Sequence, residues 1–113
     1  MLTIATFNLC NLGASASPSR FKRLGAIIAN DLAGPAIVAL QEIAAEQRWP
    51  LGTRVPADPA YQALIATATD VGGPAYAYRE IAPLADQEGG MIGANIRVGL
   101  LFDPARVRFP GRG

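Results

Sequence analysis

The chain has 113 residues, of which 50% are hydrophobic and 17% charged, and this composition predicts one globular domain or part of one. Ten basic residues against nine acidic ones leave a net charge of +1, so an anionic partner has to be held by a local site. The absence of histidine excludes Ser-His-Asp and Cys-His catalysis. Cys10 is the only cysteine, which excludes an internal disulfide, and we expect it to be a small buried residue.

Targeting signals are not visible in the sequence. The N-terminus lacks a basic segment followed by an apolar run and a small-residue cleavage site, which argues against a signal peptide. No apolar stretch is long enough to span a bilayer. We therefore expect no membrane span and a cytoplasmic location, with secretion of a full-length form left open.

The first elements are predicted to be a strand and a helix. Residues 2–9 are β-branched and aromatic enough to form a buried strand. Residues 19–32 carry apolar side chains at helical spacing. Ser17 or Ser19 can cap the start of this helix, and Gly34 ends it.

A short interior strand follows this helix. Residues 36–40 are apolar throughout and are followed directly by Gln41 and Glu42. Strand, helix and strand with short joins predict a βαβ-like unit. The ends of the two strands, carrying Asn8 and Glu42, are then expected to lie side by side.

The rest of the chain is expected to alternate between short elements and loops. The predicted elements are a helix, a strand, a glycine-rich loop, a strand, a turn and the start of a further strand, at residues 60–69, 76–81, 83–94, 95–102, 103–104 and 107–109. The basic residues of the first helix fall mostly off its apolar face, and three later arginines are predicted to be ordinary surface charges: Arg20, Lys22 and Arg23, then Arg106, Arg108 and Arg112.

Asn8 and Glu42 are the strongest candidates for chemistry. Alone, Glu42 is more simply interpreted as a solvated charge at a strand end, and Asn8 as a turn residue that bonds nearby backbone. Together, an amide and a carboxylate at adjacent strand ends can hold a hard cation. Magnesium commonly uses one or two protein carboxylates and fills its shell with water and phosphate oxygens.

Other candidates carry weaker signals. Arg97 alternates with apolar neighbours, so it can point into a cleft and bind phosphate, or face outward as an ordinary strand arginine. Tyr78 lies in an alternating strand, where packing is the simpler interpretation. Gly89, Gly90 and Gly93 let the backbone approach an anion, but glycine spacing by itself is weak evidence.

Four stretches, "TFNLCNLG", "VALQEI", "YAYREI" and "GGMIGANIRVGLLFDPARVRF", resemble the endonuclease/exonuclease/phosphatase superfamily, closest to its bacterial extracellular-nuclease-like branch. The resemblance implies a phosphodiester or phosphomonoester hydrolase that uses Mg²⁺ or Mn²⁺ on nucleic acid or another phosphoester. It implies that Glu42 is the metal ligand and that Asn8 supports the same site. Tyr78 and Arg97 fall near positions where members of the family contact the substrate phosphate.

The resemblance also implies an incomplete domain. The family fold is a four-layer α/β sandwich of two mostly antiparallel sheets with outer helices, and residues 1–113 match about its first half. Later segments of the family supply an aspartate–x–asparagine motif, further aspartates and a serine-aspartate-histidine motif. We therefore expect a chain that is inactive alone, with an uncovered sheet face through which it can associate.

Two other interpretations stay open. The chain is alternatively a non-catalytic fragment or module that binds metal or an anion, or packs on a complementary chain. It is otherwise an unrelated α/β phosphate-binding domain in which Gly89, Gly90 and Gly93 form the cradle.

Overall fold

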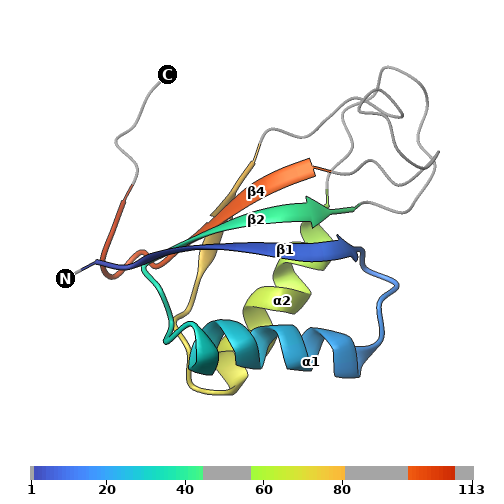
Figure 1. The fold of residues 1–113 in the computed structure, drawn as a ribbon, viewed down its shortest axis with the longest axis horizontal. Helices are drawn as coiled ribbons and strands as arrows, with labels where there is room; N and C mark the ends of the chain where they lie inside the picture. Colours follow the sequence, from blue (N-terminus) through green and yellow to red (C-terminus); the bar gives the residue numbers. More distant parts are fainter. Residues whose placement is uncertain (1, 45–56, 81–96, 109–113) are drawn as a thin grey trace.

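The computed structural model describes residues 2–44, 57–80 and 97–108 of the chain. These residues form a small mixed α+β domain with a four-stranded sheet and two α-helices (Figure 1). Its elements are β1 (Ile4–Leu12), α1 (Pro18–Ala26), the π-helical turn η1 (Ile27–Asp31), β2 (Ile37–Ile43), α2 (Asp58–Asp70), β3 (Ala77–Arg79) and β4 (Arg97–Phe102).

The sheet is mixed, with the strand order β1-β2-β4-β3. β1 and β2 are parallel, as the βαβ prediction requires, and β4 is antiparallel to both β2 and β3. Figure 1 shows α1 and α2 together on one side of this sheet. The described residues therefore form a sheet layer with a helical layer, and a second sheet is not part of them.

Local sequence explains where α1 begins and ends. Ser17 is the N-cap, and its hydroxyl accepts a hydrogen bond of 3.1 Å from the backbone N–H of Arg20. Pro18 occupies the first turn, where its missing N–H costs nothing. The helix continues into η1, and Gly34 adopts a φ of +56° in the loop that follows.

The two α-helices approach each other closely at Gly25. A Cβ atom on this residue would lie 2.4 Å from Thr67 Oγ1 and 2.7 Å from the backbone nitrogen of Ala68. Only hydrogen fits in this space, so the helices contact each other almost backbone to backbone.

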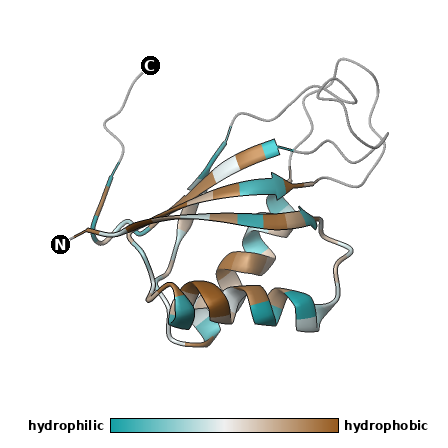
Figure 2. Cartoon of the chain, viewed as in Figure 1, coloured by the Kyte–Doolittle hydropathy of each residue, from teal (hydrophilic) through white to brown (hydrophobic). Residues whose placement is uncertain are grey.

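The core lies between the sheet and the helices. Alternate strand residues point toward α1 and α2, as the twofold strand period requires. The largest fully buried side chains of the core are Tyr61, Leu9, Leu12, Ile28, Leu40, Ile43, Leu64, Leu101 and Val38. Figure 2 shows the corresponding apolar segments along the strands and the helices.

The opposite face of the sheet has no covering layer among the described residues. Ile4 and Val98, from β1 and β4, are 69% and 68% exposed, although both are large and apolar. Because alternation continues along each strand, this open face also carries Thr6, Ala39 and Leu100. None of the helices in the described ranges is long and apolar enough to cross a membrane.

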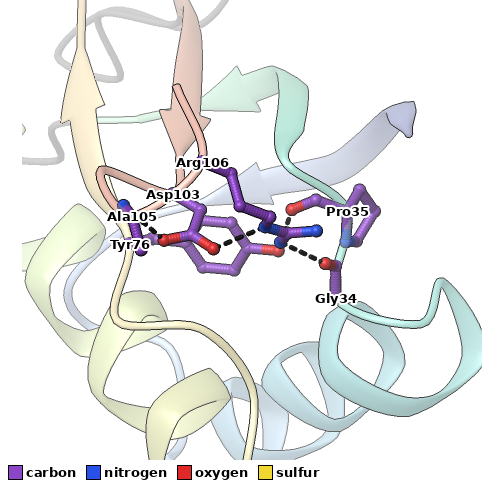
Figure 3. A network of polar contacts seen from close by, with 6 residues as sticks. All are labelled: Gly34, Pro35, Tyr76, Asp103, Ala105 and Arg106. Atoms are coloured by element: carbon purple, nitrogen blue, oxygen red, sulfur yellow. Dashed lines mark hydrogen bonds and ion pairs between the residues drawn. The ribbon is translucent and has the colours of Figure 1, made fainter. Parts of the chain in front are cut away.

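A polar clasp, formed by Gly34, Pro35, Tyr76, Asp103 and Arg106, closes the end of the sheet where β2 begins and β4 ends (Figure 3). Arg106 Nε contacts Asp103 Oδ2 at 2.6 Å, and Arg106 Nη2 donates to the carbonyl oxygen of Gly34 at 2.7 Å. The Tyr76 hydroxyl donates to the carbonyl oxygen of Pro35 at 2.5 Å. Arg106 is exposed, as predicted for a surface charge, but its contacts with Asp103 and Gly34 give it a structural role that the sequence did not predict.

Ionisation of the clasp follows from these contacts. The hydrogen bond from Arg106 lowers the pKa of Asp103 below its usual value, because it favours the charged carboxylate. Burial raises the pKa of Tyr76 to about 12, because the phenolate would lose its hydration.

Several element boundaries differ from the predictions. β1 extends to Leu12, β2 runs through Glu42 to Ile43, and β3 is limited to three residues. Cys10 is exposed rather than buried, because the backbone turns at this position with a φ of +54°.

Toward the C-terminus, residues 107–108 do not form a strand, and position 109 lies outside the described residues. The glycine-rich loop predicted at 83–94, with its three candidate glycines, also lies outside them.

Candidate functional site

Polar side chains gather at the end of the sheet opposite the clasp. Asn8 and Glu42 lie where the parallel strands β1 and β2 end, and Ile43 of β2 pairs with Arg97 at the start of β4. Glu80 follows β3, which runs antiparallel to β4 and so ends on the same side. Figure 2 shows hydrophilic residues at this end of β1, β2 and β4.

Asn8 and Glu42 contact each other directly. Asn8 Nδ2 donates a hydrogen bond of 2.5 Å to Glu42 Oε2. The other side-chain atom, Asn8 Oδ1, accepts a hydrogen bond of 2.9 Å from the backbone N–H of Cys10. The Asn8 amide is therefore held at both ends, and it fixes one oxygen of the carboxylate. The structure thus brings together the two residues that the βαβ prediction placed side by side.

Irregularities at the ends of β1 and β2 direct the side chain of Glu42 toward Asn8. The β1–β2 register shifts between Asn8 and Leu12, and the β2–β4 register shifts between Leu40 and Ile43. Regular alternation after Leu40 would turn Glu42 toward the helices. Glu42 instead has a φ of +62°, and Ile43 takes the buried position.

Three non-glycine residues at this end have left-handed backbone conformations. The φ angles are +54° for Cys10, +57° for Asn11 and +62° for Glu42. Such conformations are unfavourable for residues with a Cβ atom, by roughly 1–3 kcal/mol each, and they cluster at functional sites. Tertiary contacts must therefore hold this end of the sheet in place.

Arg20 is one of these contacts. From the first turn of α1, its Nη2 atom donates to the carbonyl oxygens of Leu9 at 2.7 Å and Cys10 at 2.5 Å. The guanidinium thus ties the helix to the turned end of β1 and adds a positive charge next to it. The sequence did not predict this role, because helical spacing places Arg20 off the apolar face without showing which atoms it contacts.

Arg97 is turned inward and buried. It forms an ion pair of 3.1 Å with Glu80, and the two side chains are 3% and 9% exposed. Tyr61 of α2 donates a hydrogen bond of 2.7 Å to the other carboxylate oxygen of Glu80. Both oxygens of Glu80 are therefore bound, which compensates for the cost of burying its charge. Of the two orientations predicted for Arg97, the structure shows the inward one.

Tyr78 packs against the same group. Its ring stacks on that of Tyr61, with centroids 4.1 Å apart and planes 6° from parallel. Its hydroxyl donates to Asp58 Oδ1 at 2.5 Å. Burial, followed by this bond to Asp58, raises the pKa of Tyr78 to about 12, and burial likewise raises the pKa of Tyr61. Tyr78 thus has the packing role that its strand position suggested.

Among the described residues at this end, Glu42 has a carboxylate oxygen without a protein donor and can accept a cation. Asn8 bonds Oε2, which leaves Oε1 to contact a cation from the solvent side. Within the described ranges, no three residues among His, Cys, Asp and Glu are grouped as a metal site. A single carboxylate suits Mg²⁺, which retains several waters, better than it suits Zn²⁺, which is usually held by three or four protein ligands.

Glu80 is the second residue of this end whose role the sequence did not predict. It directly follows the alternating segment that contains Tyr78, so its position at a strand end was the available signal. Its ion-pair partner, Arg97, comes 17 residues later in the chain. Such pairings depend on strand order, which local patterns do not determine.

No protein-family model matches this chain, and no curated protein or solved structure matches it either. The assignment of function therefore depends on the site itself.

Proposed function

We propose that this chain carries the metal-binding part of a phosphoester hydrolase of the endonuclease/exonuclease/phosphatase type, and that it is inactive alone. The observation that carries the proposal is the bond between Asn8 and Glu42, which joins residues 34 positions apart at the ends of two parallel strands. The strained turn that directs Glu42 toward Asn8 supports a functional rather than a packing role. In this proposal the sheet is one layer of the four-layer sandwich.

Each residue has a defined part in the proposed site. Glu42 holds Mg²⁺ or Mn²⁺ through the oxygen that Asn8 does not bond, and Asn8 keeps the carboxylate in one orientation. Arg20 holds the turned backbone of β1 beneath them. A bound divalent ion supplies charge stabilisation to a phosphoryl oxygen during attack by water.

The rest of the catalytic apparatus is not supplied by the described residues. The whole sequence lacks histidine, so no imidazole can protonate or stabilise the phosphate. Arg97 and Tyr78 bond to Glu80 and Asp58, so both side chains are already engaged by partners inside the protein. A substrate phosphate therefore has to compete with contacts inside the protein. We therefore expect very weak catalysis, or none, by this chain.

Metal binding can be tested with Mn²⁺ followed by electron paramagnetic resonance, since binding reduces the signal of the free ion. We expect one Mn²⁺ per chain, displaced by excess Mg²⁺, and loss of this binding in Glu42→Gln. Asp70→Asn is the matched control, because Asp70 is an exposed carboxylate at the end of α2 and should not affect binding. Unchanged binding in Glu42→Gln would refute the proposed metal site.

Catalysis needs a separate test. We expect no Mg²⁺-dependent hydrolysis above background when the purified chain is incubated with DNA, RNA or a phosphomonoester. Substantial hydrolysis that disappears in Glu42→Gln would support the site but overturn the claim that the chain is inactive alone. Hydrolysis that survives this substitution would point to a different site or a contaminant.

A second candidate is a non-catalytic module that packs on another polypeptide. The exposed Ile4 and Val98 on the open face of the sheet favour it. In this case the chain binds no divalent ion, and Glu42→Gln leaves association unchanged. The Mn²⁺ measurement therefore separates the two candidates.

A further inference from the structure

The two edges of the described sheet differ in how well they are protected against strand pairing. β3 forms one edge with only three residues, and it ends in the exposed cation Arg79. β1 forms the other edge with nine residues, none of which is charged or proline. Short length, charge and proline are the usual means by which edge strands avoid pairing with other chains. β1 uses none of these means before its bulge.

The ladder between β1 and β2 shows which β1 backbone groups face outward. The carbonyl oxygen of Thr3 accepts a hydrogen bond of 3.3 Å from the N–H of Ile37, whose register partner is Ile4. In a parallel ladder this arrangement turns the N–H and C=O of Ile4, Thr6 and Asn8 away from β2. Within the described ranges, Ile4 and Thr6 have no backbone partner on that side.

We propose that the β1 edge pairs antiparallel with β1 of a second copy of this chain, about a twofold axis perpendicular to the sheet. The pairing is centred on Thr6, the middle residue of the straight segment 4–8 that precedes the bulge. Thr6 then exchanges both backbone hydrogen bonds with its own counterpart, and Ile4 exchanges them with Asn8 of the other copy.

The absence of charge on β1 favours a second copy of the chain as the partner. Because β1 carries no charge, two copies meet without like-charge repulsion, and Thr–Thr pairs across antiparallel strands are favourable. Pairing through β3 would instead bring two copies of Arg79 near each other. The described sheet therefore offers one unprotected edge per chain, so pairing through it closes as a dimer rather than growing into a fibre.

The first test is the mass of the chain in solution, measured by light scattering and sedimentation over a wide concentration range. We expect a reversible monomer–dimer equilibrium for the natural chain. Thr6→Lys should shift the chain to monomer, because two ammonium groups would meet at the axis, while Thr6→Val should remain dimeric. Thr6 is exposed on the open face, so neither change disturbs the core. A natural chain that is monomeric throughout, or that grows beyond a dimer, would overturn the proposal.

A cross-linking experiment identifies the edge itself. In a Cys10→Ser background, Thr6→Cys should be joined into a covalent dimer by a short bis-maleimide reagent, because the two copies of residue 6 face each other across the axis. Val98→Cys is the control, since Val98 is exposed on the same face but lies in β4. Equal cross-linking at both positions, or a dimer that persists in Thr6→Lys, would show that another surface mediates association. Neither experiment depends on metal binding, so this proposal and the proposed function can fail independently.

Discussion

Arg106 donates a hydrogen bond of 2.7 Å to the carbonyl oxygen of Gly34, a residue 72 positions earlier in the chain. With Asp103, Tyr76 and Pro35, this bond joins the turn after β4 to the loop before β2. The clasp therefore fixes one end of the central β2–β4 pair, while Glu42 and Arg97 lie at the other end. The clasp and the candidate site thus lie at opposite ends of the same two strands.

The clasp should contribute measurably to stability. We expect Arg106→Ala to lower the free energy of unfolding by about 1–3 kcal/mol, because it leaves Asp103 and the Gly34 carbonyl without their charged donor. Urea unfolding followed by circular dichroism measures the change. Arg108→Ala is the control, since Arg108 is exposed, and it should lie within about 0.5 kcal/mol of the natural chain. Equal effects at both positions would contradict the structural role of Arg106.

Stability should fall in acid because of Asp103. Its folded pKa is lowered by the bond from Arg106, so the folded state binds the proton less readily than the unfolded state. This stabilisation is present above the ordinary carboxyl pKa of about 4 and is lost as pH falls through the lower folded value. Urea unfolding at a series of pH values should show this loss. Asp103→Asn should flatten the dependence in that window, and an equally steep dependence in this variant would assign it to other carboxylates.

The tyrosine hydroxyls should lose their protons only at unusually high pH. The chain has three tyrosines, and burial raises the pKa of each, to about 12 for Tyr76 and Tyr78. Ultraviolet titration should therefore show almost no tyrosinate near pH 10 in the folded protein. Since the folded pKa values exceed the unfolded value of about 10, stability is retained below pH 10 and lost above it. A full tyrosinate step near pH 10 without unfolding would contradict the packing of Tyr61 and Tyr78.

The contact between α1 and α2 should not tolerate a methyl group. Alanine normally stabilises a helix relative to glycine, yet we expect Gly25→Ala to destabilise the protein by about 1–3 kcal/mol, because the new Cβ would overlap Thr67 and Ala68. Thermal or urea unfolding shows directly whether this substitution lowers or raises the free energy of unfolding. Lys22→Ala, at an exposed position of the same helix, serves as the control and should have little effect. Stabilisation by Gly25→Ala would show that the helices are farther apart.

The sequence by itself determined the local features of this protein. Ser17, one of the two predicted caps, begins α1, and the strand, helix and strand of the first unit form close to where apolar periodicity placed them, because caps and periodicity are short-range properties. The parallel pairing that follows from this unit also placed Asn8 beside Glu42. The candidate metal ligand was therefore predictable in position.

Only the tertiary structure decided how the other residues are used. A register shift between strands decides three features: Glu42 turns out of the core, Cys10 is exposed, and Arg20 donates hydrogen bonds to the backbone of β1. The inward Arg97 and the clasp at Arg106 depend on partners that are distant in sequence. Hydrogen bonds and ion pairs of this kind are set by strand order and packing, and no local pattern of residue types encodes them.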